Sequence, residues 1–237
     1  MSLRARFDNL LVAASAELYA INRGPMRSAG LVPSPNVIDD SDLELFFASV
    51  DAGLITIHPG GKFNTLDRPK PGGRWSLLSR SQAGGWYNAE YLPQIAAYAD
   101  LILRLGYPAA RVLFELPARS LQLDLAVLDD QAQVVVLGEA KRDNAMLEKL
   151  RTACVERFDS TSPGVDTKKR GDEVRQLAWR LWTVAPRFTW LIGPGRRLAF
   201  STSVRPLTLL AVSSLPTAAE MGLGHTPPAA LEPPGLT

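Results

Sequence analysis

Three charged residues, Asp124, Glu139 and Lys141, stand within or at the end of two short apolar stretches of the chain. These stretches, residues 121–128 and 134–137, are rich in aliphatic and β-branched side chains, and the polar tetrapeptide between them predicts a hairpin. Because side chains alternate faces along a strand, Glu139 and Lys141 project from the same side. A charge within an apolar strand is costly unless it is paired or holds a metal ion. We therefore expect the three charges to converge across neighbouring strands.

This combination of residue types suits metal-assisted hydrolysis of phosphodiesters. Two carboxylates on adjacent strands, with the backbone carbonyl of Ala140, would offer the oxygen ligands that Mg²⁺ requires, with Mn²⁺ as the alternative. Lys141 would then orient or help deprotonate a water molecule and offset charge that builds up on a phosphate. The alternative interpretation is that Glu139 and Lys141 form a weak, solvated ion pair at a strand end, and that Asp124 is an inward residue of an amphipathic strand.

An aspartate in one apolar strand followed by E-x-K at the end of the next, here Asp124 and Glu139-Ala140-Lys141, resembles the PD-(D/E)xK nuclease superfamily. The similarity covers residues 87–203, and Leu123 stands where the superfamily pattern has proline. It implies a restriction-endonuclease-like fold of the α/β (α+β) class, an αβββαβ core with a mixed central sheet flanked by helices. It also implies that Asp124, Glu139 and Ala140 hold the metal and that Lys141 is catalytic.

In the superfamily a helix before the first core strand often adds another acidic residue, and Glu90 is the candidate here. The alternative is that Glu90 only favours the positive N-terminus of that helix.

Hydrophobic spacing predicts the elements that must position these residues. A helix over 88–105 precedes a strand over 111–116 that ends at Pro117, and the hairpin follows. Later elements are helices over 144–158 and 172–185, a hairpin of 188–193 with 197–203, and a further apolar run over 207–212. In the second of these helices, Gln176 and Trp179 partly match a Q-x-x-x-Y element of exonuclease-like members, but residue 180 is Arg, so that branch is not established.

Two basic groups are candidates for contact with nucleic acid. Lys62 and Arg74 lie with aromatic neighbours in a glycine-rich stretch, residues 59–85, which suits phosphate contact and base stacking. Lys168, Lys169 and Arg170 follow one another in a polar loop. For both groups the alternative is a solvated surface.

The composition is that of a globular protein, with 237 residues, 46% hydrophobic and 21% charged. A formal net charge of +2 permits a polyanionic partner without requiring one. One cysteine excludes an intrachain disulfide framework, and two isolated histidines offer no zinc site. Neither a secretory signal nor a run of membrane-spanning length is present in the sequence, so we expect a cytoplasmic protein without a membrane partner.

We expect three regions: a small N-terminal extension of helices and a hairpin over residues 1–85, a nuclease-like core over 86–213, and a disordered tail rich in proline and alanine over 214–237. The leading functional hypothesis is a magnesium-dependent nuclease acting on DNA, in restriction, defence or repair. Cutting two strands with one site per chain would favour a homodimer. The alternative is a non-catalytic module on the same fold that binds nucleic acid or protein.

Overall fold

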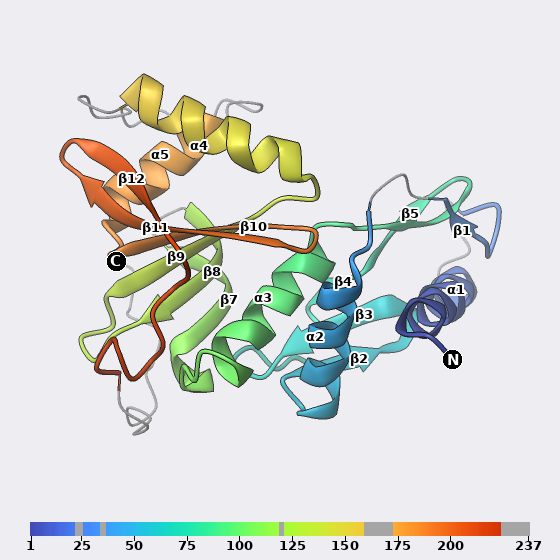
Figure 1. Cartoon of the computed structure of the whole chain (residues 1–237). Helices are drawn as coiled ribbons and strands as arrows, with labels where there is room; N and C mark the ends of the chain where they lie inside the picture. The colour runs from blue at the N-terminus through green and yellow to red at the C-terminus, as the bar shows by residue number, and fades with distance from the viewer. Residues whose placement is uncertain (22–25, 34–36, 119–120, 159–172, 224–237) are drawn as a thin grey trace. The chain divides into compact units, whose positions relative to one another are not determined.

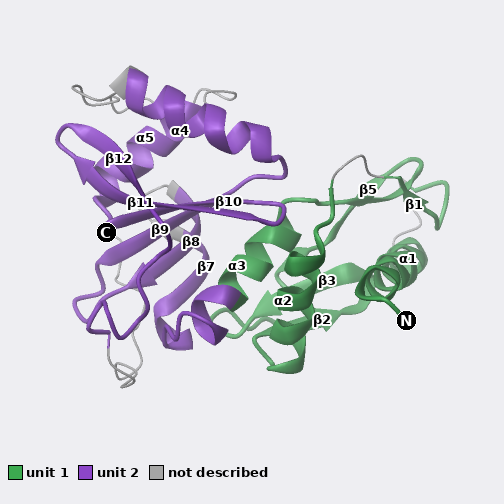
Figure 2. Cartoon of the chain, viewed as in Figure 1, with its two compact units in different colours: residues 1–99 green, residues 100–237 purple. Residues whose placement is uncertain are grey.

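The computed structural model describes residues 1–21, 26–33, 37–118, 121–158 and 173–223 (Figure 1). The chain divides into two compact units, Met1–Ala99 and Asp100–Thr237, which Figure 2 colours separately. The division falls within α3 (Tyr91–Leu103), whereas we expected it between residues 85 and 86. Helices and sheets occur in both units, so the expected mixed α/β class is confirmed. None of the described helices is long and apolar enough to cross a lipid bilayer.

The second unit is built on a six-stranded sheet with the order β12-β11-β10-β9-β8-β7. Its strands are β7 (Val112–Ala118), β8 (Leu121–Leu128), β9 (Val134–Ala140), β10 (Phe188–Gly193), β11 (Arg196–Val204) and β12 (Leu207–Val212). Only β9 and β10 are parallel among these neighbours, and the other pairs are antiparallel. The crossover between the two parallel strands carries α4 (Asn144–Phe158) and α5 (Glu173–Val184), as a parallel connection requires.

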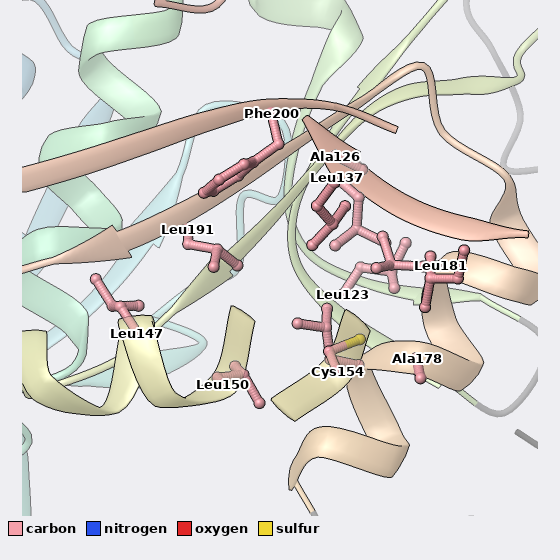
Figure 3. Packing of buried hydrophobic residues seen from close by; sticks show 13 residues of the cluster. Leu123, Ala126, Leu137, Leu147, Leu150, Cys154, Ala178, Leu181, Leu191 and Phe200 are labelled. Atoms are coloured by element: carbon pink, nitrogen blue, oxygen red, sulfur yellow. The ribbon is translucent and has the colours of Figure 1, made fainter. Parts of the chain in front are cut away.

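Both α4 and α5 pack on the same face of this sheet, as Figure 3 shows for the side chains between them. The cluster includes Cys154, which is fully buried and sits among leucines. Its buried members come from both helices and from β8 to β12: Leu123, Ala126, Leu137, Leu147, Leu150, Cys154, Leu177, Ala178, Leu181, Leu191, Phe200, Leu207 and Leu209. The same apolar spacing that predicted the helices therefore fixes them to the sheet.

The first strand of the sheet runs further than its sequence predicts. We expected it to end before Pro117, yet the antiparallel register continues through Pro117 opposite Gln122 and Ala118 opposite Leu121. Because β7 is the edge strand of the sheet, a residue without an N–H can be accommodated there.

The segment after β12 is also packed. Leu215, Ala218 and Leu223 are buried, and the Ala218 N–H donates to the Leu105 carbonyl at 2.9 Å. The tail expected from residue 214 is therefore part of the packed chain as far as Leu223, and residues 224–237 lie outside the described part.

The first unit contains α1 (Leu3–Ile21), α2 (Asp40–Asp51) and the start of α3. Asp39 caps α2 by accepting the Ser41 N–H at 2.9 Å. Two three-stranded sheets accompany the helices: β2 (Ile55–His58), β3 (Lys62–Thr65) and β4 (Trp75–Ser76) form one, and β1 (Leu31–Val32), β6 (Gly84–Tyr87) and β5 (Leu78–Ser81) form the other. The glycine-rich stretch of residues 59–85 thus contains β3, β4, β5 and the start of β6. Two short 3-10 turns, Pro59–Gly61 and Ala109–Arg111, complete the elements.

Two adjacent leucines on β12 test the core of the second unit. Leu209 is 7% exposed and belongs to the cluster beneath the helices, whereas Leu210 is 66% exposed on the other face. Leu209→Ala should lower the free energy of unfolding by about 2–5 kcal/mol through lost burial and a cavity, and Leu210→Ala by less than about 0.5 kcal/mol. Urea denaturation followed by tryptophan fluorescence measures both, and equal losses would contradict the assigned register of β12.

Candidate functional site

Three neighbouring strands place a carboxylate at the same level of the six-stranded sheet. Leu125 of β8 lies opposite Phe114 of β7 and Gly138 of β9. The next residue toward the N-terminus, Asp124, therefore comes level with Glu115 on one side and Glu139 on the other. Regular pairing is interrupted at this level: the β7–β8 register passes over Glu115, and the β8–β9 ladder ends at Leu125.

Asp124 lies at the point where the regular pairing of β8 with β9 ends. Its Oδ2 accepts the Ala140 N–H at 2.8 Å, so the aspartate side chain takes up a backbone donor of the neighbouring strand. The carboxylate of β8 is thereby held against the middle residue of the E-x-K sequence. This hydrogen bond is the contact that joins the two halves of the motif.

Glu139 lies in the interior, with 4% of its surface exposed, and each of its oxygens has a cationic partner. Lys141 Nζ donates to Glu139 Oε1 at 3.0 Å, and Arg180 Nη1 donates to Oε2. Lys141 Nζ also lies 3.8 Å from Glu173 Oε2. Asp124, Glu139 and Lys141 are thus brought together, and α5 adds two charged residues to them.

Arg180 is not among the predicted site residues, and in the sequence it stands out only as a departure from Q-x-x-x-Y. It lies on α5 beside Leu177 and Leu181, two buried residues of the helix core face. A cationic side chain bordering the apolar stripe of an amphipathic helix is the signal that could have identified it, because such a position directs the charge toward the sheet. Glu173 and Arg180 are two helical turns apart, so both face the site.

The pKa values of Asp124 and Glu139 are shifted in opposite directions. Burial and the Glu139 carboxylate raise the pKa of Asp124 well above its ordinary value, and Arg180 and the Ala140 N–H offset this only in part. Burial also acts to raise the pKa of Glu139, but Arg180 and Lys141 outweigh it and lower that pKa below its ordinary value. The surroundings therefore favour the anionic form of Glu139, whereas they make ionisation of Asp124 more costly than in water.

A strained residue borders the site. Glu115 has φ 50°, in the left-handed region that residues other than glycine rarely adopt. Gln122 Nε2 donates to Glu115 Oε2, so this side chain is also held at the same end of the sheet. The charge of Glu115 contributes to raising the pKa of Asp124.

The other predicted residues are distributed over the chain. Glu90 is exposed, directly precedes α3 and belongs to the first unit, so the site in the second unit is described without it. Lys62 and Arg74 are exposed in the first unit, on β3 and directly before β4. Phe63, one of their aromatic neighbours, is fully buried and packs against Trp75 and so cannot stack on a base. Lys168, Lys169 and Arg170 lie outside the described residues.

The donor set fits a small, hard cation. Mg²⁺ is commonly held by one or two carboxylates with water completing its shell, and Asp124 with Glu139 supplies two, beside the backbone of Ala140. Burial, and after it the neighbouring Glu139 carboxylate, raise the pKa of Asp124, and a bound cation would favour its ionised form. Within the described part of the chain no group of three or more His, Cys, Asp or Glu side chains could hold a metal ion. A cation here would therefore depend on these two acids, and Glu139 would have to exchange a partner.

No protein-family model, curated protein or solved structure matches this chain. The chemical assignment therefore depends on the residues and geometry described above.

Replacing Asp124 or Glu139 by the corresponding amide should change the thermal stability of the protein in opposite directions. The folded-state pKa of Asp124 is raised, so ionising it costs stability as pH rises from its ordinary value of 3.8. Asp124→Asn should therefore raise the melting temperature at neutral pH in EDTA, with a gain that shrinks in acid.

Glu139→Gln provides the matched contrast. Because the pKa of Glu139 is lowered, its ionised form contributes to the stability of the fold above pH 4.5, the ordinary pKa. This contribution is lost as pH falls through the folded-state pKa. The substitution should cost about 3 kcal/mol at neutral pH, because it removes the buried anion that both Lys141 and Arg180 contact, and less in acid. Thermal melts of both variants between pH 4 and 8 test this, and changes of the same sign would refute the assigned charge states.

Proposed function

We propose that this protein is a metal-dependent nuclease that hydrolyses phosphodiester bonds of DNA. The observation that carries the proposal is the hydrogen bond from the Ala140 N–H to Asp124, which joins the aspartate of one strand to the E-x-K of the next. The order α3, β7, β8, β9, α4, then β10 after α5, supports a restriction-endonuclease-like αβββαβ core in which α5 is an additional helix.

Asp124 and Glu139 would hold the cation, with the Ala140 carbonyl as a further ligand. Bound there, Mg²⁺ or Mn²⁺ would polarise the phosphate and favour ionisation of a water molecule. The cation would also lower the cost of ionising the buried Asp124, because its charge attracts that carboxylate and opposes the charge of Glu139. Both acids would then act as anions at neutral pH.

Lys141 would position the attacking water and stabilise negative charge on the phosphate. Its ammonium lies on the same face as Glu139 and 3.0 Å from Oε1, at the rim of the acid pair. Hydrolysis adds water across one P–O bond, and the products are one phosphomonoester end and one hydroxyl end. An ammonium beside the reacting phosphate lowers the barrier because it is already oriented before charge develops.

A non-catalytic module that binds nucleic acid is the second candidate, and one observation favours it. Both oxygens of Glu139 are neutralised by Lys141 and Arg180, which stabilises the site without a metal ion. Such a site could be a structural charge network whose only ligand is the DNA backbone. Binding without cleavage would distinguish this module from the nuclease.

Two substitutions test the nuclease directly. Asp124→Asn and Lys141→Ala should each reduce cleavage of plasmid and linear duplex DNA in Mg²⁺ or Mn²⁺ by at least about 10²-fold, because each removes a group that acts at the reacting phosphate. Gel assays of single-turnover cleavage, with EDTA and RNA arms, measure the loss and the substrate class.

Arg142→Ala is the matched control, since Arg142 is exposed beside Lys141 and is given no role in the reaction. It should cleave at the wild-type rate. Full activity in both site variants would reject the assignment, and binding of DNA by the wild type without cleavage in any metal would favour the module.

A further inference from the structure

Arg180 binds a carboxylate oxygen that a divalent cation at this site would need. Its Nη1 donates to Glu139 Oε2, and its charge also interacts with Asp124 and Glu115. The guanidinium therefore sits among the three carboxylates that come level on β7, β8 and β9. Lys141 holds the other oxygen of Glu139, so Oε2 is the oxygen whose partner comes from outside the E-x-K strand.

The two cationic partners of Glu139 differ in how they are attached. Lys141 follows Glu139 on the same strand end, and its backbone N–H is fixed by the Ile192 carbonyl at 2.8 Å. Arg180 reaches the site from α5 through a long side chain of which 15% is exposed. Such a side chain can withdraw by rotation about its own bonds while Leu177 and Leu181 keep the helix in place.

We propose that Arg180 is an exchangeable counter-ion of the site: it holds Glu139 Oε2 in the metal-free protein and is displaced from that oxygen when a divalent cation binds. This inference rests on the proposed function, since it assigns a positioning role within the same site. Two cations cannot share the buried oxygen without strong repulsion, so the metal and the guanidinium compete. The ion pair stabilises the fold before metal arrives and weakens the affinity for the metal.

Removing the competitor should therefore tighten metal binding. In the full-length protein freed of metal by EDTA, Arg180→Gln should bind Mn²⁺ at least about tenfold more tightly than the wild type, the range expected when a charge-assisted hydrogen bond no longer has to be broken. Arg142→Gln removes the same charge from an exposed neighbouring position. The affinity of this variant for Mn²⁺ should stay within about twofold of that of the wild type, because an exposed charge is screened. Calorimetric titration at fixed ionic strength measures all three proteins.

A purely structural role for Arg180 predicts a different result. If its only function were to support the fold, Arg180→Gln would bind Mn²⁺ equally or more weakly, and that outcome would overturn the inference. An equal gain in Arg142→Gln would also overturn it, since the effect would then be one of net charge.

A measurement on the unaltered chain covers the case in which Arg180→Gln fails to fold. The ¹⁵N guanidinium resonance of Arg180, assigned by comparison with Arg180→Lys, should shift on titration with Mg²⁺ as the ion pair with Glu139 breaks. A resonance that stays unchanged at saturating Mg²⁺, or an absence of metal binding in every protein, would refute the exchange.

The outcomes for this inference and for the nuclease can be told apart. Tighter Mn²⁺ binding by Arg180→Gln, with no DNA cleavage by the wild type, would keep the exchange and reject the nuclease. Cleavage by the wild type, with unchanged Mn²⁺ affinity in Arg180→Gln, would keep the nuclease and reject the exchange.

Discussion

The structure around the site depends on one hydrogen bond, from the Ala140 N–H to the Asp124 carboxylate. It replaces a backbone bond at the point where the β8–β9 ladder stops after Leu125 and Gly138. A slip of one residue in that register would turn every side chain of β8 to the opposite face. The apolar residues that fix the register for the sake of the core therefore also determine where the acid pair meets.

Charge burial is tolerated here because α5 supplies a cationic partner to Glu139 next to the hydrophobic core. Leu137 belongs to the buried cluster, and Glu139 follows it on the same face of β9. The packing that holds α5 on the sheet delivers Arg180 to Glu139, so hydrophobic and electrostatic stabilisation share the same helix. A buried anion with two cationic partners costs far less than an isolated one.

Backbone strain occurs at the same level of the sheet. Glu115, with its positive φ, is the residue that the β7–β8 register passes over, opposite Asp124. Such conformations cost about 1–3 kcal/mol and persist where the surrounding contacts compensate for them. Both ladders are interrupted beside Asp124, and its carboxylate accepts the Ala140 N–H there.

Local patterns alone determined most of the elements of the second unit. The helix over 144–158 and the strand over 188–193 have the predicted bounds, because their apolar spacing and the turn residues at their ends agree. The apposition of Asp124 with the E-x-K strand also follows from the hairpin, whose two strands are close in sequence. These are short-range features, and a single sequence carries them.

Tertiary structure decided the rest. Pro117 stays in a strand only because β7 is the sheet edge, and residues 215–223 are ordered by contacts with a distant part of the chain, such as Leu105. Above all, Arg180 meets Glu139 because α5 folds back over a sheet whose strands are far from it in sequence. The sequence alone determined which charges stand in the apolar strands, whereas the partner of the central carboxylate depended on long-range packing, which no local spacing encodes.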